Sequence, residues 1–252
     1  MTTAARPARG DERRVHLAQK VRLGDVTSRH RLRLDAAARY LQDVATDDGD
    51  DAELPAGRGW ILRRLEFDVD RLPRLSEDLV LATFCTGLGV GARWAERTTT
   101  VADAEGAVVL TGRGIWVYVD LATGAPAPLT EEFFAVYGDT LREHRVSARL
   151  TLPKLDAALP RAGWPLRRTD IDVYGHVNNA SYWEAVEEWL GGPGTDRRVI
   201  GATIEFGSGI APDDACELAV VETESEATFW FVVDGDTRAT ARVVFDPARG
   251  GR

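Results

Sequence analysis

The segment DIDVYGHVNNASYWEAVEEWL, residues 170–190, decides the fold because its pattern occurs twice in the chain. Placing Asp25 against Asp170 gives an offset of 145 residues (170 − 25), and a helix-like run follows both aspartates. In the first copy, residues 32–48 carry apolar side chains at helical spacing. In the second copy, Trp183, Val186 and Leu190 share one face of the run. We therefore predict two equivalent amphipathic helices.

Most of the remaining chain alternates apolar and polar residues, which is typical of half-buried antiparallel strands. Several such stretches follow the first predicted helix and several follow the second. The LEF of residues 65–67 resembles the IEF of residues 204–206, at an offset of 139 (204 − 65). The repeat thus keeps its register through helix and strand. We infer a duplicated α+β unit in which an antiparallel sheet curls around one long helix.

This arrangement is that of the hotdog fold, and two units in one chain make a fused hotdog pseudo-dimer. The boundary of the first unit lies after a strand that ends near Asp120, and the second unit begins close to Trp164. We assign the chain as follows: 1–14, disordered tail; 15–130, N-terminal hotdog; 131–162, linker; 163–247, C-terminal hotdog; 248–252, tail.

Composition excludes several classes of protein. Of the 252 residues, 44% are hydrophobic, which is enough for a core, and the net charge of −9 argues against a nucleic-acid partner. Cys85 and Cys216 predict neither a disulfide framework nor a metal site, and we expect buried, inert thiols and no cofactor. The chain has no membrane-spanning apolar run and no apolar leader at its N-terminus, so we expect a cytoplasmic protein without a membrane partner.

The two copies differ in the residues that precede their helices. The second copy carries a cluster of carboxylate, imidazole and amide side chains, and the equivalent positions of the first copy hold none of these. The cluster and its counterparts are Asp172, Tyr174, His176, Asn178 and Asn179 against Thr27, Arg29, Arg31, Arg33 and Leu34. A capping motif alone does not require this combination, so the asymmetry points to a site in the second copy.

The chemistry of such a site follows from its residue types. Asp172 can act as a general base or a nucleophile, and His176 can transfer a proton or orient the carboxylate. Gly175 allows close approach of the backbone, and backbone N–H groups from Val177 to Asn179 can bind an oxyanion at the positive end of a helix. Taken singly, each residue also has a structural interpretation: Asn178 or Asn179 as the helix cap, Asp172 as a cap and His176 as a structural histidine.

Two further acidic residues occur in both copies and are therefore interpreted as structural. Asp170 is matched by Asp25, and Glu205 is matched by Glu66, although the first copy lacks the cluster. We expect Asp170 to pair with a neighbouring arginine at 167 or 168.

The segment from Asp172 to Asn179 resembles the active site of hotdog thioesterases, and its YGHVNN is also similar to single-hotdog 4-hydroxybenzoyl-CoA-type enzymes. Residues 15–246 as a whole resemble the acyl-acyl carrier protein (ACP) thioesterases. The resemblance implies hydrolysis of a fatty acyl thioester on ACP, with catalysis in the second hotdog. Tyr174 stands where that family usually has Asn, and residues 209–210 stand where many members have Glu or Cys. Tyr174 is thus expected to line the pocket or to donate a hydrogen bond through its hydroxyl.

Three interpretations of function stay open at this stage. The first is an acyl-ACP thioesterase, which would dock its acidic carrier through exposed arginines at 63–64, 161, 167–168 or 197–198. The second is an acyl-CoA thioesterase that uses the same site, and the third is a non-catalytic acyl-binding or regulatory protein. The acyl tunnel is expected beside the first helix. A monomer and a homodimer are equally compatible with a fused pair of hotdogs.

Overall fold

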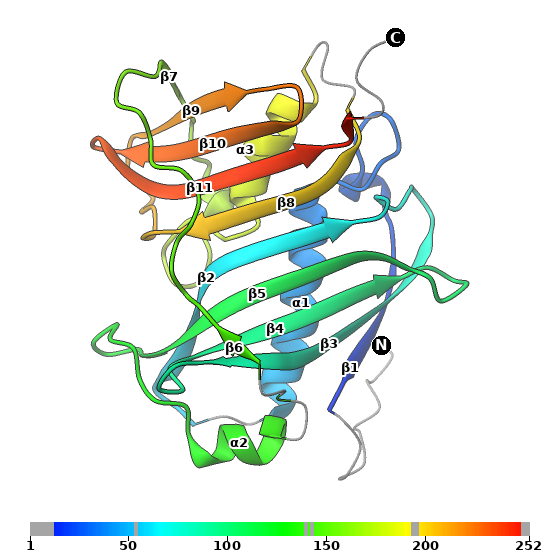
Figure 1. The fold of residues 1–252 in the computed structure, drawn as a ribbon, viewed down its shortest axis with the longest axis vertical. Coiled ribbons are helices and arrows are strands. Elements are labelled where there is room, and N and C mark those ends of the chain that lie inside the picture. The colour runs from blue at the N-terminus through cyan, green and yellow to red at the C-terminus, as the bar shows by residue number, and fades with distance from the viewer. Residues whose placement is uncertain (1–12, 53–54, 139–140, 142–143, 193–196, 248–252) are drawn as a thin grey trace.

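A computed structural model shows an α+β protein built on one large, strongly curved sheet (Figure 1). The structure describes residues 13–52, 55–138, 141, 144–192 and 197–247. The described strands of both halves of the chain belong to this one sheet. No helix in the described ranges is both long and apolar enough to cross a membrane.

The first hotdog wraps its strands around the helix α1 (Leu34–Ala52). Leu34, Leu41 and Val44 are buried on the side of α1 that faces the sheet, as the helical spacing predicts. The strands of this unit are β1 (Val15–Lys20), β2 (Arg58–Val69), β3 (Asp78–Gly89), β4 (Trp94–Ala102) and β5 (Val108–Asp120).

The second hotdog repeats this plan around the shorter helix α3 (Ser181–Leu190). Its strands are β8 (Val199–Phe206), β9 (Cys216–Glu222), β10 (Glu226–Val233) and β11 (Asp236–Phe245). The short β7 (Arg161–Gly163) adds to the edge at β9. The predicted fold class, two tandem hotdogs that form a pseudo-dimer, is therefore confirmed.

The strand order across the sheet is β1-β3-β4-β5-β2-β8-β11-β10-β9-β7. The two units therefore meet where β2 pairs with β8 in antiparallel register. Leu65 lies opposite Ile204, and these residues are related by the sequence offset of 139 (204 − 65). The pseudo-two-fold axis therefore passes through this pair. Residues of α1 also contact residues of α3. Because buried side chains of both units form one core, the two hotdogs pack as one body.

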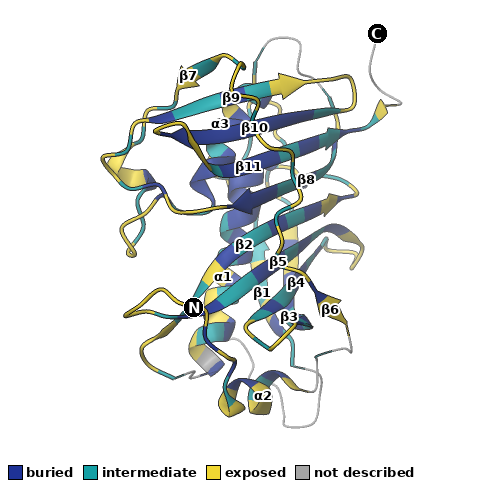
Figure 2. Ribbon diagram, turned by 60° about the vertical axis from the view of Figure 1, so that its left-hand side comes forward, coloured by how far each residue is buried: buried dark blue, intermediate teal, exposed yellow. Residues whose placement is uncertain are grey.

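The segment between the units is more ordered than a plain linker. It contains α2 (Glu131–Tyr137), whose Phe133 packs against Trp60 in the first unit. It also contains β6 (Arg145–Val146) and then crosses the outer face of the second unit, where Leu155 and Leu159 cover Trp230. This cover explains why β10 is buried along most of its length (Figure 2).

The two ends of the chain can be compared with the predicted tails only in part. Residues 1–12 and 248–252, which were predicted to be tails, lie outside the described residues. Arg13 and Arg14, which the sequence placed in the disordered tail, are ordered. Arg13 forms an ion pair of 2.6 Å with buried Asp48, and the Arg14 guanidinium lies 4.0 Å from the centre of the Phe84 ring. These contacts lie inside the segment 1–14 that was assigned to the tail, and the domain bounds stay a prediction.

Candidate active site

The segment that carries the predicted site begins with a short 3-10 turn, Arg168–Asp170. Asp170 is buried, and its carboxylate accepts the Arg167 backbone N–H at 2.7 Å and the Arg167 guanidinium at 2.6 Å. The first copy has the same arrangement, in which Asp25 accepts the Arg22 N–H at 3.0 Å. The structural interpretation of Asp170 is therefore supported by its bonds.

A tight turn then brings Asp172 and His176 together on one loop. The Asp172 N–H donates to the His176 carbonyl at 2.9 Å, and the Gly175 N–H donates to the Asp172 carbonyl at 3.0 Å. Gly175 has a φ of 79°, a left-handed conformation that favours glycine. Asp172 Oδ1 accepts the Tyr174 N–H at 2.9 Å, which leaves Oδ2 available for chemistry. No hydrogen bond links the Asp172 and His176 side chains in the part of the chain that the structure describes.

The ring of His176 packs against Gly209 in the loop after β8. A Cβ atom at position 209 would lie 2.6 Å from the histidine Cδ2, so a larger residue would displace the ring. Gly209 is one of the two positions where the sequence departs from the family pattern. The imidazole thus occupies the space that a side chain at this position would need.

Two of the three predicted oxyanion donors are used in hydrogen bonds within the protein. The Val177 N–H donates to the Ile210 carbonyl at 2.9 Å, and the Asn178 N–H donates to the Asp170 carbonyl at 2.7 Å. These bonds correct the prediction that the backbone of Val177 and Asn178 binds an oxyanion, because both N–H groups are used to hold the turn. Among the three predicted donors, the Asn179 N–H is the one without such a bond in the described residues.

Asn178 closes the turn and opens the helix. Its Oδ1 accepts the Ala180 N–H at 2.9 Å, and its carbonyl accepts the Ser181 N–H at 2.9 Å. Helix α3 begins at Ser181, and the residue before it, Ala180, has no side-chain cap. Asn178, not Asn179, therefore performs the capping role that the sequence assigned to either asparagine.

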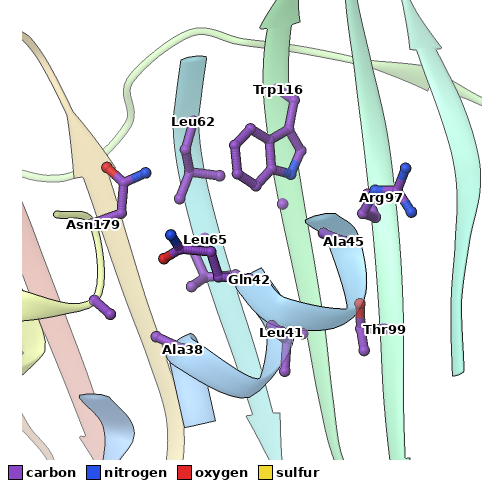
Figure 3. A pocket seen from close by; sticks show the side chains of 13 residues that line it. Ala38, Leu41, Gln42, Ala45, Leu62, Leu65, Arg97, Thr99, Trp116 and Asn179 are labelled. Atoms are coloured by element: carbon purple, nitrogen blue, oxygen red, sulfur yellow. The ribbon is translucent and has the colours of Figure 1, made fainter. Parts of the chain in front are cut away.

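A pocket opens at the start of α3 and runs beneath α1 of the other hotdog (Figure 3). Asn179 borders it on one side, and Arg97 and Thr99 lie at its opposite side. Between them the lining comes from α1 and from strands β2 and β5: Ala38, Leu41, Gln42, Ala45, Leu62, Leu65, Gly112, Gly114 and Trp116. Ala180 also contributes to the lining. The lining does not include Asp172 or His176, which stand on the adjoining turn.

The position of Tyr174 bears on one of the two roles that the sequence suggested for it, the lining of the pocket. Its side chain is 73% exposed at the tip of the turn, beside Val173, which is 94% exposed. Tyr174 does not line the pocket, and no described hydrogen bond involves its hydroxyl. The substitution for asparagine at this position therefore presents an aromatic surface to solvent next to the site.

Sequence reasoning missed two glycines of β5 that line the pocket. Gly112 on β5 faces α1 so closely that a Cβ atom would lie 2.0 Å from the Leu41 side chain. Gly114 makes comparable room for the Trp116 indole, at 2.6 Å. The two glycines at alternate positions of one strand were the available signal, since they mark a strand face that other groups approach closely.

Both cysteines are buried, as predicted. Burial raises the pKa of Cys85 to about 11 and that of Cys216 to about 11. The thiols are therefore protonated at neutral pH, and neither is a nucleophile candidate.

Comparison with known proteins places this geometry in a family. Residues 15–137 match the acyl-ACP thioesterase N-terminal domain, and residues 155–246 match the acyl-ACP thioesterase C-terminal domain. The chain belongs to the acyl-ACP thioesterase family. Membership of this family identifies the chain as a thioester hydrolase.

Relatives of this family member support the assignment over nearly its whole length. The uncharacterized proteins MT2057 and Rv2001 of two Mycobacterium tuberculosis strains are each 33% identical over 220 residues, which is 86% of either chain. An acyl-ACP thioesterase from Bacteroides thetaiotaomicron has a TM-score of 0.79 at 20% identity, covering 92% of this chain and 98% of that one. The 12:0-ACP thioesterase from Umbellularia californica has a TM-score of 0.75 at 18% identity, covering 93% and 97%. These structures show a common fold.

Proposed function

We propose that this thioesterase releases fatty acids from acyl carrier protein, with the acyl chain in the pocket under α1 and the thioester at the start of α3. One observation carries the proposal: the pocket of the first hotdog borders Asn179, three residues after His176 on the catalytic turn of the second hotdog. An apolar chain that enters the pocket therefore leaves its thioester carbonyl beside Asp172 and His176.

Within this site, Asp172 acts as general base or nucleophile toward the thioester carbon. Its carboxylate is half-buried, which keeps it accessible to water and to substrate. His176 is exposed and supplies or accepts a proton at the leaving thiol. The Asn179 N–H, at the positive end of α3, donates to the carbonyl oxygen as charge develops there.

Docking of an acidic carrier protein requires unpaired positive charge near the site. Most of the arginines that the sequence offered are engaged internally: Arg64 pairs with buried Glu205 at 2.8 Å, and Arg197 pairs with Glu222. Arg167 pairs with Asp170 and Glu184. Arg168 is exposed beside the catalytic turn, so this residue is the position that we assign to carrier docking.

The test compares kcat/KM for the same acyl group on ACP and on coenzyme A, with mass spectrometry of the released acid. We expect faster turnover of the ACP ester and a selective loss of that preference in Arg168→Glu. Equal or better turnover of the CoA ester would contradict the ACP assignment and favour an acyl-CoA thioesterase that uses the same site. Failure to release thiol above background from either ester would contradict the catalytic site.

A further inference from the structure

At the interface between the two hotdogs, a side chain of α3 contacts the N-terminus of α1. Glu187 of α3 is buried, and its Oε1 accepts the Leu34 backbone N–H at 2.7 Å. The Arg31 guanidinium donates to the same carboxylate at 3.1 and 2.7 Å. A carboxylate oxygen is therefore bound at the first turn of α1, where the helix dipole favours negative charge.

The duplication carries this arrangement over to the catalytic copy. The offset of 145 relates Leu34 to Asn179 (179 − 34) and Gln42 to Glu187 (187 − 42). The pseudo-two-fold axis thus places Gln42 of α1 toward the start of α3, as Glu187 of α3 lies at the start of α1. The structure agrees, because Gln42 and Asn179 line the same pocket (Figure 3).

The two equivalent side chains differ in what they can do. The Glu187 carboxylate only accepts hydrogen bonds, and it occupies the donor at its helix start. The Gln42 carboxamide is neutral and carries an N–H donor on Nε2. No hydrogen bond joins Gln42 to Asn179 in the part of the chain that the structure describes. At the start of α3, the position that corresponds to the Glu187 oxygen is therefore available to an oxygen atom of the substrate.

We propose that Gln42 is a further catalytic residue, contributed by the first hotdog, whose Nε2 donates to the thioester carbonyl oxygen together with the Asn179 N–H. This inference rests on the proposed hydrolysis at Asp172. In the general-base route, the water oxygen bonds to the thioester carbon while Asp172 takes the proton. The carbonyl electron pair moves onto the oxygen that Gln42 and Asn179 hold. As the pair returns, the C–S bond breaks and the thiolate takes a proton from His176.

The deciding experiment is the substitution Gln42→Glu. It places a carboxylate near the start of α3, as Glu187 places one at the start of α1. A carboxylate there accepts the Asn179 N–H and repels the developing oxyanion, so we expect kcat to fall about 100-fold at pH 8 with a smaller change in KM. Activity relative to wild type should rise as the pH is lowered, because the protonated carboxyl can donate again. Gln42→Ala should lose about tenfold or more in kcat without this pH-dependent recovery.

Controls separate the possible failures. Glu187→Gln changes the equivalent side chain of the other copy, so it should lower Tm but leave kcat unchanged. If both Gln42 variants keep wild-type kcat and pH profile while Asp172→Asn is inactive, the role of Gln42 is wrong and the proposed function stands. An inactive wild type would overturn both proposals. Should Gln42→Glu fail to fold, as judged by its circular dichroism, wild-type kcat in Gln42→Ala alone would overturn the role.

Discussion

The turns before α1 and α3 share their backbone and differ in their side chains. In the first turn, the Thr27 N–H donates to the Arg31 carbonyl at 2.8 Å, as the Asp172 N–H donates to His176 at 2.9 Å in the second. His30 takes a φ of 62°, where the second copy has Gly175 at 79°. The two turns therefore share a backbone plan, and what differs is the side chains on it, with Asp172 and His176 in the second turn against Thr27 and Arg31 in the first.

The helices and strands that follow the two turns differ in how tightly their side chains pack. Ala38 of α1 lines the pocket, whereas its equivalent Trp183 of α3 is fully buried and packs on Phe67. On the facing strands, the pocket-lining Gly112 pairs with Phe67, and the buried Ala239 pairs with the equivalent Phe206. The first hotdog thus keeps a pocket at positions that the second hotdog fills with side chains. Most of the pocket lining lies in the first copy, and the residues predicted to be catalytic lie in the second.

The largest effect is expected from removing the carboxylate that only the second turn has. Asp172→Asn should reduce kcat by about 1,000-fold, because the amide can neither take a proton nor attack the thioester. Thiol release from an acyl-ACP measures this. Thr27→Asn makes a matched change on the first turn and should leave kcat at the wild-type value. Retention of activity in Asp172→Asn would end the assignment of the catalytic turn.

Two glutamates occupy equivalent positions on β2 and β8, and we expect their substitution to affect the stability of the protein to different extents. Glu205 is buried, pairs with Arg64 at 2.8 Å and accepts the Thr151 and Leu152 backbone N–H groups. Glu205→Ala should lower the free energy of unfolding by about 3 kcal/mol, because the arginine and two N–H groups lose their partner. Glu66→Ala, at the equivalent half-exposed position, should cost less than about 0.5 kcal/mol. Urea unfolding of both variants measures the difference, and equal costs would refute it.

Exchanging the pocket residue between the copies should change substrate range. Ala38→Trp places the side chain found at position 183 into the pocket. We expect kcat/KM for a palmitoyl thioester to fall on the order of 10- to 100-fold, since the chain loses its apolar contacts. Turnover of a butyryl thioester should change little, and it serves as the internal control alongside Tm. An equal loss on both esters would indicate general damage and would count against the pocket as the acyl site.

The smallest effect concerns Asp35, which is fully buried in the first turn of α1. Burial opposes its ionised form, but hydrogen bonds from Arg33 and Arg39 outweigh burial and lower its pKa. Its contribution to stability is therefore complete above the unfolded pKa of about 4 and is lost as the pH falls below that value. Asp35→Asn should be less stable at pH 7 and should lose less stability on acidification.

Urea unfolding at pH 7 and at pH 3 measures this change in pH dependence. Asp78→Asn, which removes an exposed ion pair with Lys20, is the control and should shift stability at pH 7 by less than about 0.5 kcal/mol. An acid dependence in Asp35→Asn that equals that of the wild type would contradict the coupling to Arg33 and Arg39.

Much of the architecture was predictable because periodicity and repetition are local properties of the sequence. Helical spacing identified α1 and α3, and the two offsets predicted the duplicated hotdog that the structure confirms. The offset of 139 also relates Leu65 to Ile204, the two residues that lie opposite each other at the pseudo-two-fold axis. The cluster from Asp172 to Asn179 stood out because its own duplicate lacks it. Its role in catalysis stays a prediction.

Only the tertiary structure decided which groups of that cluster remain available. The Val177 N–H is used by Ile210, and the His176 ring packs on Gly209, because a loop some 30 residues away folds back onto the turn. The pocket is lined by residues that lie far apart in sequence, such as Ala38 of α1 and Gly112 of β5. Periodicity shows which face of an element is buried. Which partner that face meets depends on contacts between distant segments, and these contacts bring Gln42 and Asn179 to the same pocket.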